Sequence, residues 1–240
     1  MEGFLFIDKP AGPTSHDIVD QIRKLTGIKK VGHAGTLDPF ATGLLILALG
    51  NTTKKIQALV GLDKEYEALV QLGATSDTYD RTGRITEGSK IKYKVAKEDI
   101  EDVLKKFRGK IEQIPPMYSA KKVKGKKLYE LARKGIEIVR QPSQITIHKL
   151  EIENFDPELK TLTLRVQCSS GTYVRSLAYD IGQELGCGAY LKELRRTSIG
   201  PFRIEDAAQL EPLSKDNVAE HLHLTDKTLG AIETISKTSK

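Results

Sequence analysis

Apolar residues recur at helical spacing in two stretches of this 240-residue chain. A spacing of three and four residues places them on one face of a helix. The first predicted helix begins at Ser15, which can cap it, and ends at Gly27, with an apolar face made of Ile18, Val19, Ile22 and Leu25. The second covers residues 97–107, with Ile100, Val103, Leu104 and Phe107 on one side.

Other stretches alternate between apolar and polar residues, which is typical of strands. Leu162, Leu164 and Val166 alternate with polar residues, and we predict strands over residues 4–8, 66–72, 136–150 and 161–168 and a strand pair over 189–204. Further helices are predicted over residues 52–60, from Gly171 to about Leu185, and around Glu205 to Leu210. Strands and helices do not alternate strictly, so the pattern predicts an α+β fold with a central mixed, largely antiparallel sheet flanked by helices.

Composition narrows the function classes. Hydrophobic residues make up 39% and charged residues 29%, as in ordinary soluble globular proteins. The longest apolar run, residues 44–49, is too short to span a bilayer, and the N-terminus lacks the pattern of a signal peptide. Cys168 and Cys187 suggest neither a disulfide scaffold nor a zinc site, so we expect a cytoplasmic protein. The net charge of +6 favours a polyanionic partner.

Candidate chemistry centres on Asp38, in the glycine-punctuated loop that begins at Gly32 and ends at Gly43. An apolar run follows this loop directly, and a carboxylate beside a buried segment costs free energy unless something offsets it. Asp38 is therefore a candidate catalytic group. The alternative is that Asp38-Pro39 only opens a turn.

Residues 118–134 form a second candidate region. Seven Lys or Arg side chains accompany a single acid, Glu130, and Tyr118 and Tyr129 lie among them. Lysines bind phosphates and tyrosines stack on unpaired bases, so this composition suits RNA. The alternative is a solvated basic loop. Lys29-Lys30 and Arg195-Arg196 are expected to extend the same positive surface.

Several motifs together resemble the bacterial tRNA pseudouridine synthase B (TruB) family, and they occur in the order of that family from about residue 3 to residue 204. They are Phe4–Ser15, Gly32–Gly43, Lys64–Ala68, Pro116–Gly125, Tyr129–Arg133, Gly171–Leu177 and Leu194–Thr197. The resemblance implies the pseudouridine synthase fold and the isomerisation of uridine 55 in the T-loop of tRNA to pseudouridine, with the target base flipped out of its stack.

The resemblance also implies a set of site residues. Asp38, Tyr66 and Arg175 match the catalytic aspartate, the tyrosine that packs on the target base and the arginine that pairs with the aspartate. His33, Tyr173 and Leu194 match the histidine that supports the T-loop, a second aromatic of the pocket and an apolar wall. Lys121, Lys122 and Lys124 match the insertion that grips the T-stem and T-loop. Lys9 and Pro10 are expected to pack behind the catalytic loop.

An isomerisation needs no cofactor and no metal, and the sequence contains no phosphate-binding glycine loop and no His/Cys cluster. We expect a catalytic domain over residues 1–204, with the basic insertion at about 108–134. Residues 205–240 are expected to form a short C-terminal extension without a complete PUA domain. The expected partner is tRNA, without membrane or metal, and the protein is expected to act as a monomer.

Two alternatives to this function remain open. One is a related synthase that acts on another RNA. The other is an RNA-folding chaperone that binds tRNA without turnover. The sequence also leaves open whether Asp38 forms a covalent adduct with the ribose or acts through a glycal intermediate.

Overall fold

The computed structural model describes residues 1–87, 95–119, 121–123 and 125–238. Its chain forms two compact units, one of residues 1–66 with 194–240 and the other of residues 67–193. Strands β4 (Lys64–Leu72) and β12 (Ala189–Ile199) contain residues of both units.

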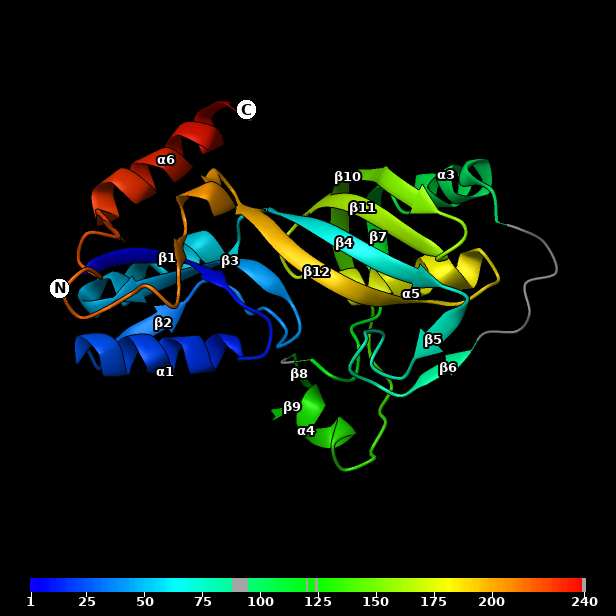
Figure 1. The fold of residues 1–240 in the computed structure, drawn as a ribbon, viewed down its shortest axis with the longest axis horizontal. Coiled ribbons are helices and arrows are strands. Elements are labelled where there is room, and N and C mark those ends of the chain that lie inside the picture. Colours follow the sequence, from blue (N-terminus) through cyan, green and yellow to red (C-terminus); the bar gives the residue numbers. More distant parts are fainter. Residues whose placement is uncertain (88–94, 120, 124, 239–240) are drawn as a thin grey trace. The chain divides into compact units, whose positions relative to one another are not determined.

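The first unit contains a mixed sheet with its strands in the order β14-β1-β3-β12 (Figure 1). β1 (Gly3–Lys9) pairs antiparallel with β3 (Thr42–Leu49) along its whole length, and β3 pairs in parallel with β12. Four short strands complete this sheet: β2 (Val31–His33), β13 (Phe202–Arg203), β14 (Ala208–Gln209) and β15 (Leu222–His223). The mixed, largely antiparallel sheet of the prediction is therefore confirmed here.

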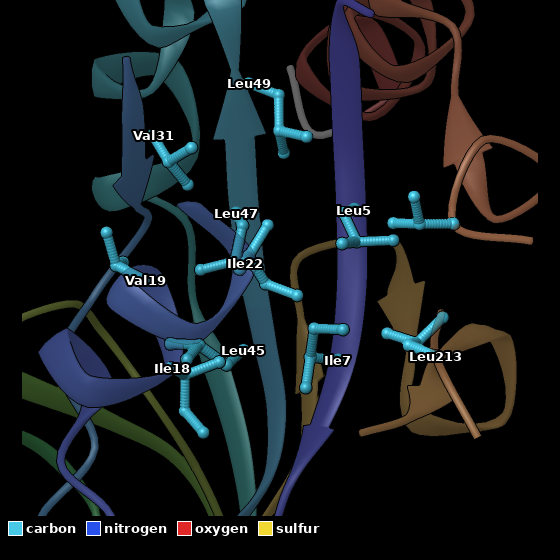
Figure 2. Packing of buried hydrophobic residues seen from close by; sticks show 11 residues of the cluster. Leu5, Ile7, Ile18, Val19, Ile22, Val31, Leu45, Leu47, Leu49 and Leu213 are labelled. Carbon is cyan, nitrogen blue, oxygen red and sulfur yellow. The ribbon is translucent and has the colours of Figure 1, made fainter. Parts of the chain in front are cut away.

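Alternation along β1 and β3 supplies two apolar faces. Leu5, Ile7, Leu45, Leu47 and Leu49 pack against the helix α1 (Ser15–Thr26) in one cluster, shown in Figure 2. The intervening residues, Phe4, Phe6, Leu44, Ile46 and Ala48, pack on the other face with Ile199 and Phe202. Since both faces are covered, the whole apolar run of β3 is buried.

Helix α1 shows how local sequence sets an element. The side chain of Thr14 accepts a hydrogen bond from the Asp17 amide, and Asp17 accepts one from the Thr14 amide, which makes a capping box. Gly27 ends the helix in the left-handed conformation, with φ of 72°. The predicted helix is confirmed, but the cap is Thr14 and not Ser15, whose hydroxyl bonds to Leu37 instead.

In the sheet of the second unit, the strands follow the order β12-β4-β11-β10-β7. β10 pairs antiparallel with both β7 and β11. The long elements are β7 (Gly109–Gln113), β10 (Ser143–Asp156), β11 (Thr161–Cys168), α3 (Lys97–Lys105) and α5 (Val174–Glu184). Helix α3 contacts α5 and β10, and buries Ile100 and Leu104. The short elements are β5 (Ala74–Ser76), β6 (Ile85–Glu87), β8 (Lys122–Val123), β9 (Lys126–Lys127) and α4 (Leu128–Ala132).

Several predicted boundaries were wrong. Residues 52–60 form a 3₁₀ helix, Gly50–Lys55, and one α-turn, α2 (Gln57–Val60), and not one helix. The strand predicted from residue 136 begins only at Ser143, and α5 begins at Val174 and not at Gly171. The predicted helix around Glu205–Leu210 is a 3₁₀ turn, Ile204–Asp206, followed by β14, because pairing with β1 determines the conformation there. Helix α6 (Thr225–Thr238) was not predicted.

Candidate active site

The loop that carries Asp38 lies between β2 and β3 and is fixed on both sides of that residue. The Ser15 hydroxyl accepts a hydrogen bond from the Leu37 amide at 2.8 Å and donates one to the Leu37 carbonyl at 3.1 Å. The Asp38 carbonyl accepts one from the Ala41 amide at 3.1 Å. Asp38-Pro39 does open a turn, as the structural alternative predicted, and that turn fixes the backbone of the half-buried Asp38.

Lys9 supports this loop from behind, as predicted. Its side chain is fully buried, and its ammonium donates to the carbonyls of Pro10 at 2.8 Å, Pro39 at 3.3 Å and Ala41 at 2.8 Å. Burial lowers the pKa of Lys9 to about 8, and the negative charge of Asp38 opposes that shift. A cation thus lies within electrostatic range of the candidate catalytic carboxylate.

Arg196 is the largest fully buried side chain of the described residues, with an exposed fraction of 1%. Its Nε donates to the Leu44 carbonyl at 2.7 Å and its Nη2 to the Gly35 carbonyl at 3.2 Å. β12 approaches β3 closely at this point because residue 43 is a glycine. Gly43 has φ of +105°, and a Cβ there would overlap the backbone of Arg196. The expectation that Arg195-Arg196 extends a positive surface was therefore wrong. Arg195 forms two hydrogen bonds with Asp8, and Arg196 lies inside.

Arg196 also connects two predicted site residues. Its side chain hydrogen-bonds to Tyr66, which is only 8% exposed on the buried face of β4. Burial lowers the pKa of His33, and the charge of Arg196 lowers it further, so the imidazole is neutral near pH 7. Leu194, on the same face of β12 as Arg196, is 7% exposed. Within the first unit, the structure thus arranges Tyr66 and His33 around one buried guanidinium.

Arg175 lies in the second unit, in the first turn of α5, and is 5% exposed. A cation at a helix N-terminus is electrostatically unfavourable, which predicted an acidic partner. One such partner is Asp80, whose Oδ2 lies 3.6 Å from Nη1 of Arg175. The predicted pairing with Asp38 joins residues of different units and stays a prediction.

Asp80 is held by its own turn. Its Oδ1 accepts hydrogen bonds from the Thr78 hydroxyl at 2.9 Å, the Thr82 amide at 2.9 Å and the Thr82 hydroxyl at 2.5 Å. Asp80 thus bonds to its local backbone, and so does Asp77, which accepts from the Arg84 amide. The ion pair with Arg175 was missed. The sequence does contain a signal for this turn. Thr78 and Thr82 lie two positions before and after Asp80, where their hydroxyls can donate to its carboxylate.

Tyr173 precedes α5 and is positioned by its backbone. The buried Gln113 side chain donates to the Tyr173 carbonyl at 3.0 Å and accepts from the Tyr173 amide at 2.8 Å. This pair of hydrogen bonds between β7 and the start of α5 fixes the first turn that carries Arg175.

The basic segment, residues 118–134, surrounds the β8–β9 hairpin and α4. Lys121 donates to the Ser143 hydroxyl, and the Arg133 guanidinium lies 5.5 Å from the centre of the Tyr129 ring. Lys126, Arg133 and Lys134 are exposed. Of Lys122 only the backbone is described, and Lys124 lies outside the described residues.

Within the described parts of the chain, no group of three or more His, Cys, Asp or Glu side chains could hold a metal ion. The same residues include no helix that is long and apolar enough to cross a membrane.

Comparisons with known proteins define the class. Residues 23–174 match the family described as TruB family pseudouridylate synthase (N terminal domain), and residues 175–235 match the tRNA pseudouridylate synthase B C-terminal domain. In a solved structure titled as a Cbf5-Nop10-Gar1 complex, one chain is 31% identical with a TM-score of 0.75, over 95% of this chain and 62% of that one. The present chain thus spans less than two thirds of that protein, but its fold is that of the pseudouridine synthases.

Curated relatives narrow the assignment. The tRNA pseudouridine synthase B of Clostridium tetani is 44% identical, over 98% of this chain and 80% of that protein. Its namesake from Azoarcus sp. is 50% identical, over 91% of this chain and 72% of that protein. The chain belongs to the TruB family of pseudouridylate synthases.

Proposed function

We propose that this protein isomerises uridine 55 in the T-loop of tRNA to pseudouridine. Support comes from the names of relatives that are 44% and 50% identical over most of their length. The observation that carries the proposal is the well-fixed loop of Asp38. Lys9 and Ser15 hydrogen-bond to the backbone of this loop, and Asp38 is half-buried.

The reaction breaks the bond between ribose C1′ and uracil N1, rotates the base, and forms a bond between C1′ and C5. The proton on C5 leaves, and N1 gains one, so the atoms balance without a cofactor. Asp38 either attacks C1′ or removes the proton from C2′. Tyr66 stacks on the base, and its phenolate form takes the C5 proton and becomes the neutral phenol. Arg175 pairs with Asp38 and keeps it ionised.

Binding is assigned to the remaining residues. His33, neutral and half-buried, supports the T-loop, while Tyr173 and Leu194 line the pocket of the flipped base. Lys121, Lys122 and Lys124 contact the phosphates of the T-stem and T-loop. Residues 1–204 act as the catalytic domain, residues 205–240 as its extension, and the protein works as a monomer in the cytoplasm.

A related synthase acting on another RNA is the second candidate. It is favoured by the 30% identity, with a TM-score of 0.66, to a chain in a structure titled as an H/ACA RNP bound to a substrate RNA. The basic segment within this chain favours direct capture of tRNA. An RNA chaperone without turnover is disfavoured, because the family is one of synthases.

The deciding experiment incubates the purified protein with unmodified tRNA transcript and maps pseudouridine at single-nucleotide resolution. We expect one modified position, in the T-loop, and none in a transcript with cytidine there. Asp38→Asn keeps the shape of the side chain but loses its charge, so turnover should fall about 1,000-fold or more while tRNA affinity changes less than about threefold. Modification elsewhere in the transcript would refute the substrate assignment, and an active Asp38→Asn variant would refute the role of Asp38.

A further inference from the structure

Two consecutive residues, Tyr79 and Asp80, contact successive turns of helix α5. The ring of Tyr79 stacks on that of Tyr179, with centroids 4.1 Å apart and planes inclined by 23°. Asp80 forms its ion pair with Arg175 at 3.6 Å. Residues 175 and 179 are four positions apart and therefore lie on one face of the helix. The loop thus binds one face of α5 at two points, one aromatic and one charged.

The backbone of Tyr79 makes this double contact possible. In an extended chain, consecutive side chains point to opposite sides. Tyr79 instead has φ of 67°, a left-handed conformation that bulky residues seldom adopt. Its amide donates to the Ser76 carbonyl at 3.0 Å, and its carbonyl accepts from the Leu191 amide at 2.9 Å. Such a conformation persists only where the surroundings hold it, and it tends to occur at functional sites.

The hydroxyl of Tyr79 provides a third attachment. It hydrogen-bonds to Arg140, whose Nη1 also donates to the Pro115 carbonyl at 3.2 Å. Pro115 precedes the basic segment and Arg140 follows it, so Arg140 ties the two ends of that segment together. Tyr79 therefore contacts both α5 and the base of the segment to which we assign phosphate binding.

We propose that Tyr79 is a positioning residue, whose stack on Tyr179 holds Asp80 against Arg175 and so orients the Arg175 guanidinium for the reaction. This inference rests on the proposed function, since it assigns Arg175 a role there. Tyr79 itself contacts neither substrate nor reacting atoms. Its effect passes through Asp80, the residue that follows it in the chain.

Matched substitutions separate the ring from the backbone. Tyr79→Asn deletes the ring but tolerates a positive φ, Tyr79→Phe keeps the ring, and Tyr179→Leu deletes the other half of the stack. We expect single-turnover rates at saturating tRNA to fall about tenfold in Tyr79→Asn and Tyr179→Leu, with dissociation constants within about twofold of wild type. Tyr79→Phe should stay within about threefold of the wild-type rate.

Lys160→Asn is the control for backbone strain. Lys160 is the other described non-glycine residue with a positive φ, 52°, and its side chain is exposed in the turn between β10 and β11. Its rate should equal that of wild type. Wild-type rates in Tyr79→Asn and Tyr179→Leu would overturn the proposal. A Tyr79→Phe variant as slow as Tyr79→Asn would show that the stack is not what matters, and would overturn it too.

Amide hydrogen exchange tests this inference without any measurement of tRNA modification. The Thr82 amide donates to Asp80 at 2.9 Å, so its exchange rate reports whether the carboxylate stays in place. We expect faster exchange at Thr82 in Tyr179→Leu than in wild type, with unchanged exchange in the strands of the first unit. If the wild-type protein leaves tRNA unmodified, the proposed function fails, and exchange at Thr82 alone decides whether the stack holds Asp80. Unchanged exchange there would then overturn the positioning role.

Discussion

The guanidinium of Arg196 hydrogen-bonds to the side chain of Tyr66 inside the first unit, where both residues are almost fully buried. Among the described residues, the ion pairs within 4.0 Å include no carboxylate bound to Arg196. A buried cation beside a phenol stabilises the phenolate form, in which the oxygen carries negative charge. A phenolate oxygen can accept a proton, so this arrangement suits the role proposed for Tyr66.

Tyr66→Phe and Tyr66→Leu separate the hydroxyl from the ring. Phe keeps the stacking face and loses the hydroxyl with its bond to Arg196, so tRNA affinity should be nearly normal while the single-turnover rate falls about 100-fold. Leu removes the aromatic face as well and should weaken capture of the flipped base by about 1–3 kcal/mol. Single-turnover rates and dissociation constants of both variants check this. If only the Leu variant were slow, Tyr66 would act by stacking alone, and two variants as fast as wild type would remove it from the site.

Arg175 and Asp80 form a buried ion pair whose two members should respond differently to substitution. Arg175→Lys keeps the charge but loses the planar fork, so turnover should fall strongly with a modest loss of affinity. Asp80→Asn leaves the buried guanidinium without this carboxylate and should lower the free energy of unfolding by about 3 kcal/mol. Denaturant unfolding and single-turnover kinetics measure the two effects. An Asp80→Asn variant as stable as wild type would mean that this ion pair contributes nothing to folding.

Much of the fold follows from the sequence because its elements have clear periods. Helix α1 and strands β1, β4 and β11 lie where alternation or helical spacing predicts them. The predicted elements are wrong where pairing between distant segments determines the secondary structure. Residues 208–209 are a strand only because β1 lies beside them, and no local pattern contains that information.

The same distinction applies to the site. The loop of Asp38 could be predicted because glycines punctuate it and an apolar run follows it directly. The position of Lys9 behind that loop could be predicted only from the resemblance to the family. Two adjacent arginines predict one charged patch, but the structure buries Arg196. Alternation along β12 places Arg196 on the face of Leu194 and Ser198, which are both buried, and Arg195 on the other. Asp80 has threonines two positions before and after it, but its ion-pair partner Arg175 lies 95 positions away in the chain, beyond any local signal.

Lys9 should make stability depend on pH above neutrality. Its pKa is about 8 in the folded protein and 10.5 for the ordinary side chain, so between these values the unfolded state binds one more proton than the native state. Stability should therefore rise with pH in that window, by about 1.4 kcal/mol per pH unit, and this contribution should be absent in Lys9→Met. Urea unfolding of both proteins between pH 8 and 10.5 measures the difference in slope. Equal slopes would show that the pKa of Lys9 is not lowered.

Lys9→Met should also be less stable at pH 7, because it leaves the carbonyls of Pro39 and Ala41 without their donor. Unsatisfied buried acceptors cost about 1–3 kcal/mol each. This loss is separate from the change in slope, since it is measured at pH 7, below the pKa of Lys9 in the folded protein.

The basic segment should carry part of the salt dependence of tRNA binding, and the structure divides its cations into two groups. Lys126, Arg133 and Lys134 are exposed, whereas the Lys121 ammonium is bound to the Ser143 hydroxyl. Replacing the three exposed residues with Ala should weaken binding and reduce the slope of log K against log salt by about 0.7–0.9 for each phosphate that the variant no longer neutralises. Lys121→Ala should reduce the slope by less than replacement of one exposed lysine does, because the Lys121 ammonium must leave the Ser143 hydroxyl to contact a phosphate.

The matched control removes the same amount of charge elsewhere in the second unit. Lys97, Lys105 and Lys149 are exposed on α3 and β10, outside residues 108–134, and their triple Ala variant should leave the slope nearly unchanged. Filter-binding or fluorescence titrations from about 50 to 300 mM salt would measure each slope. If both triple variants lowered the slope equally, the basic segment would be a solvated charged loop that contributes only net charge. If only the variant within residues 118–134 did, phosphates contact this segment directly, since a purely long-range field depends on total charge and the two variants have the same total charge.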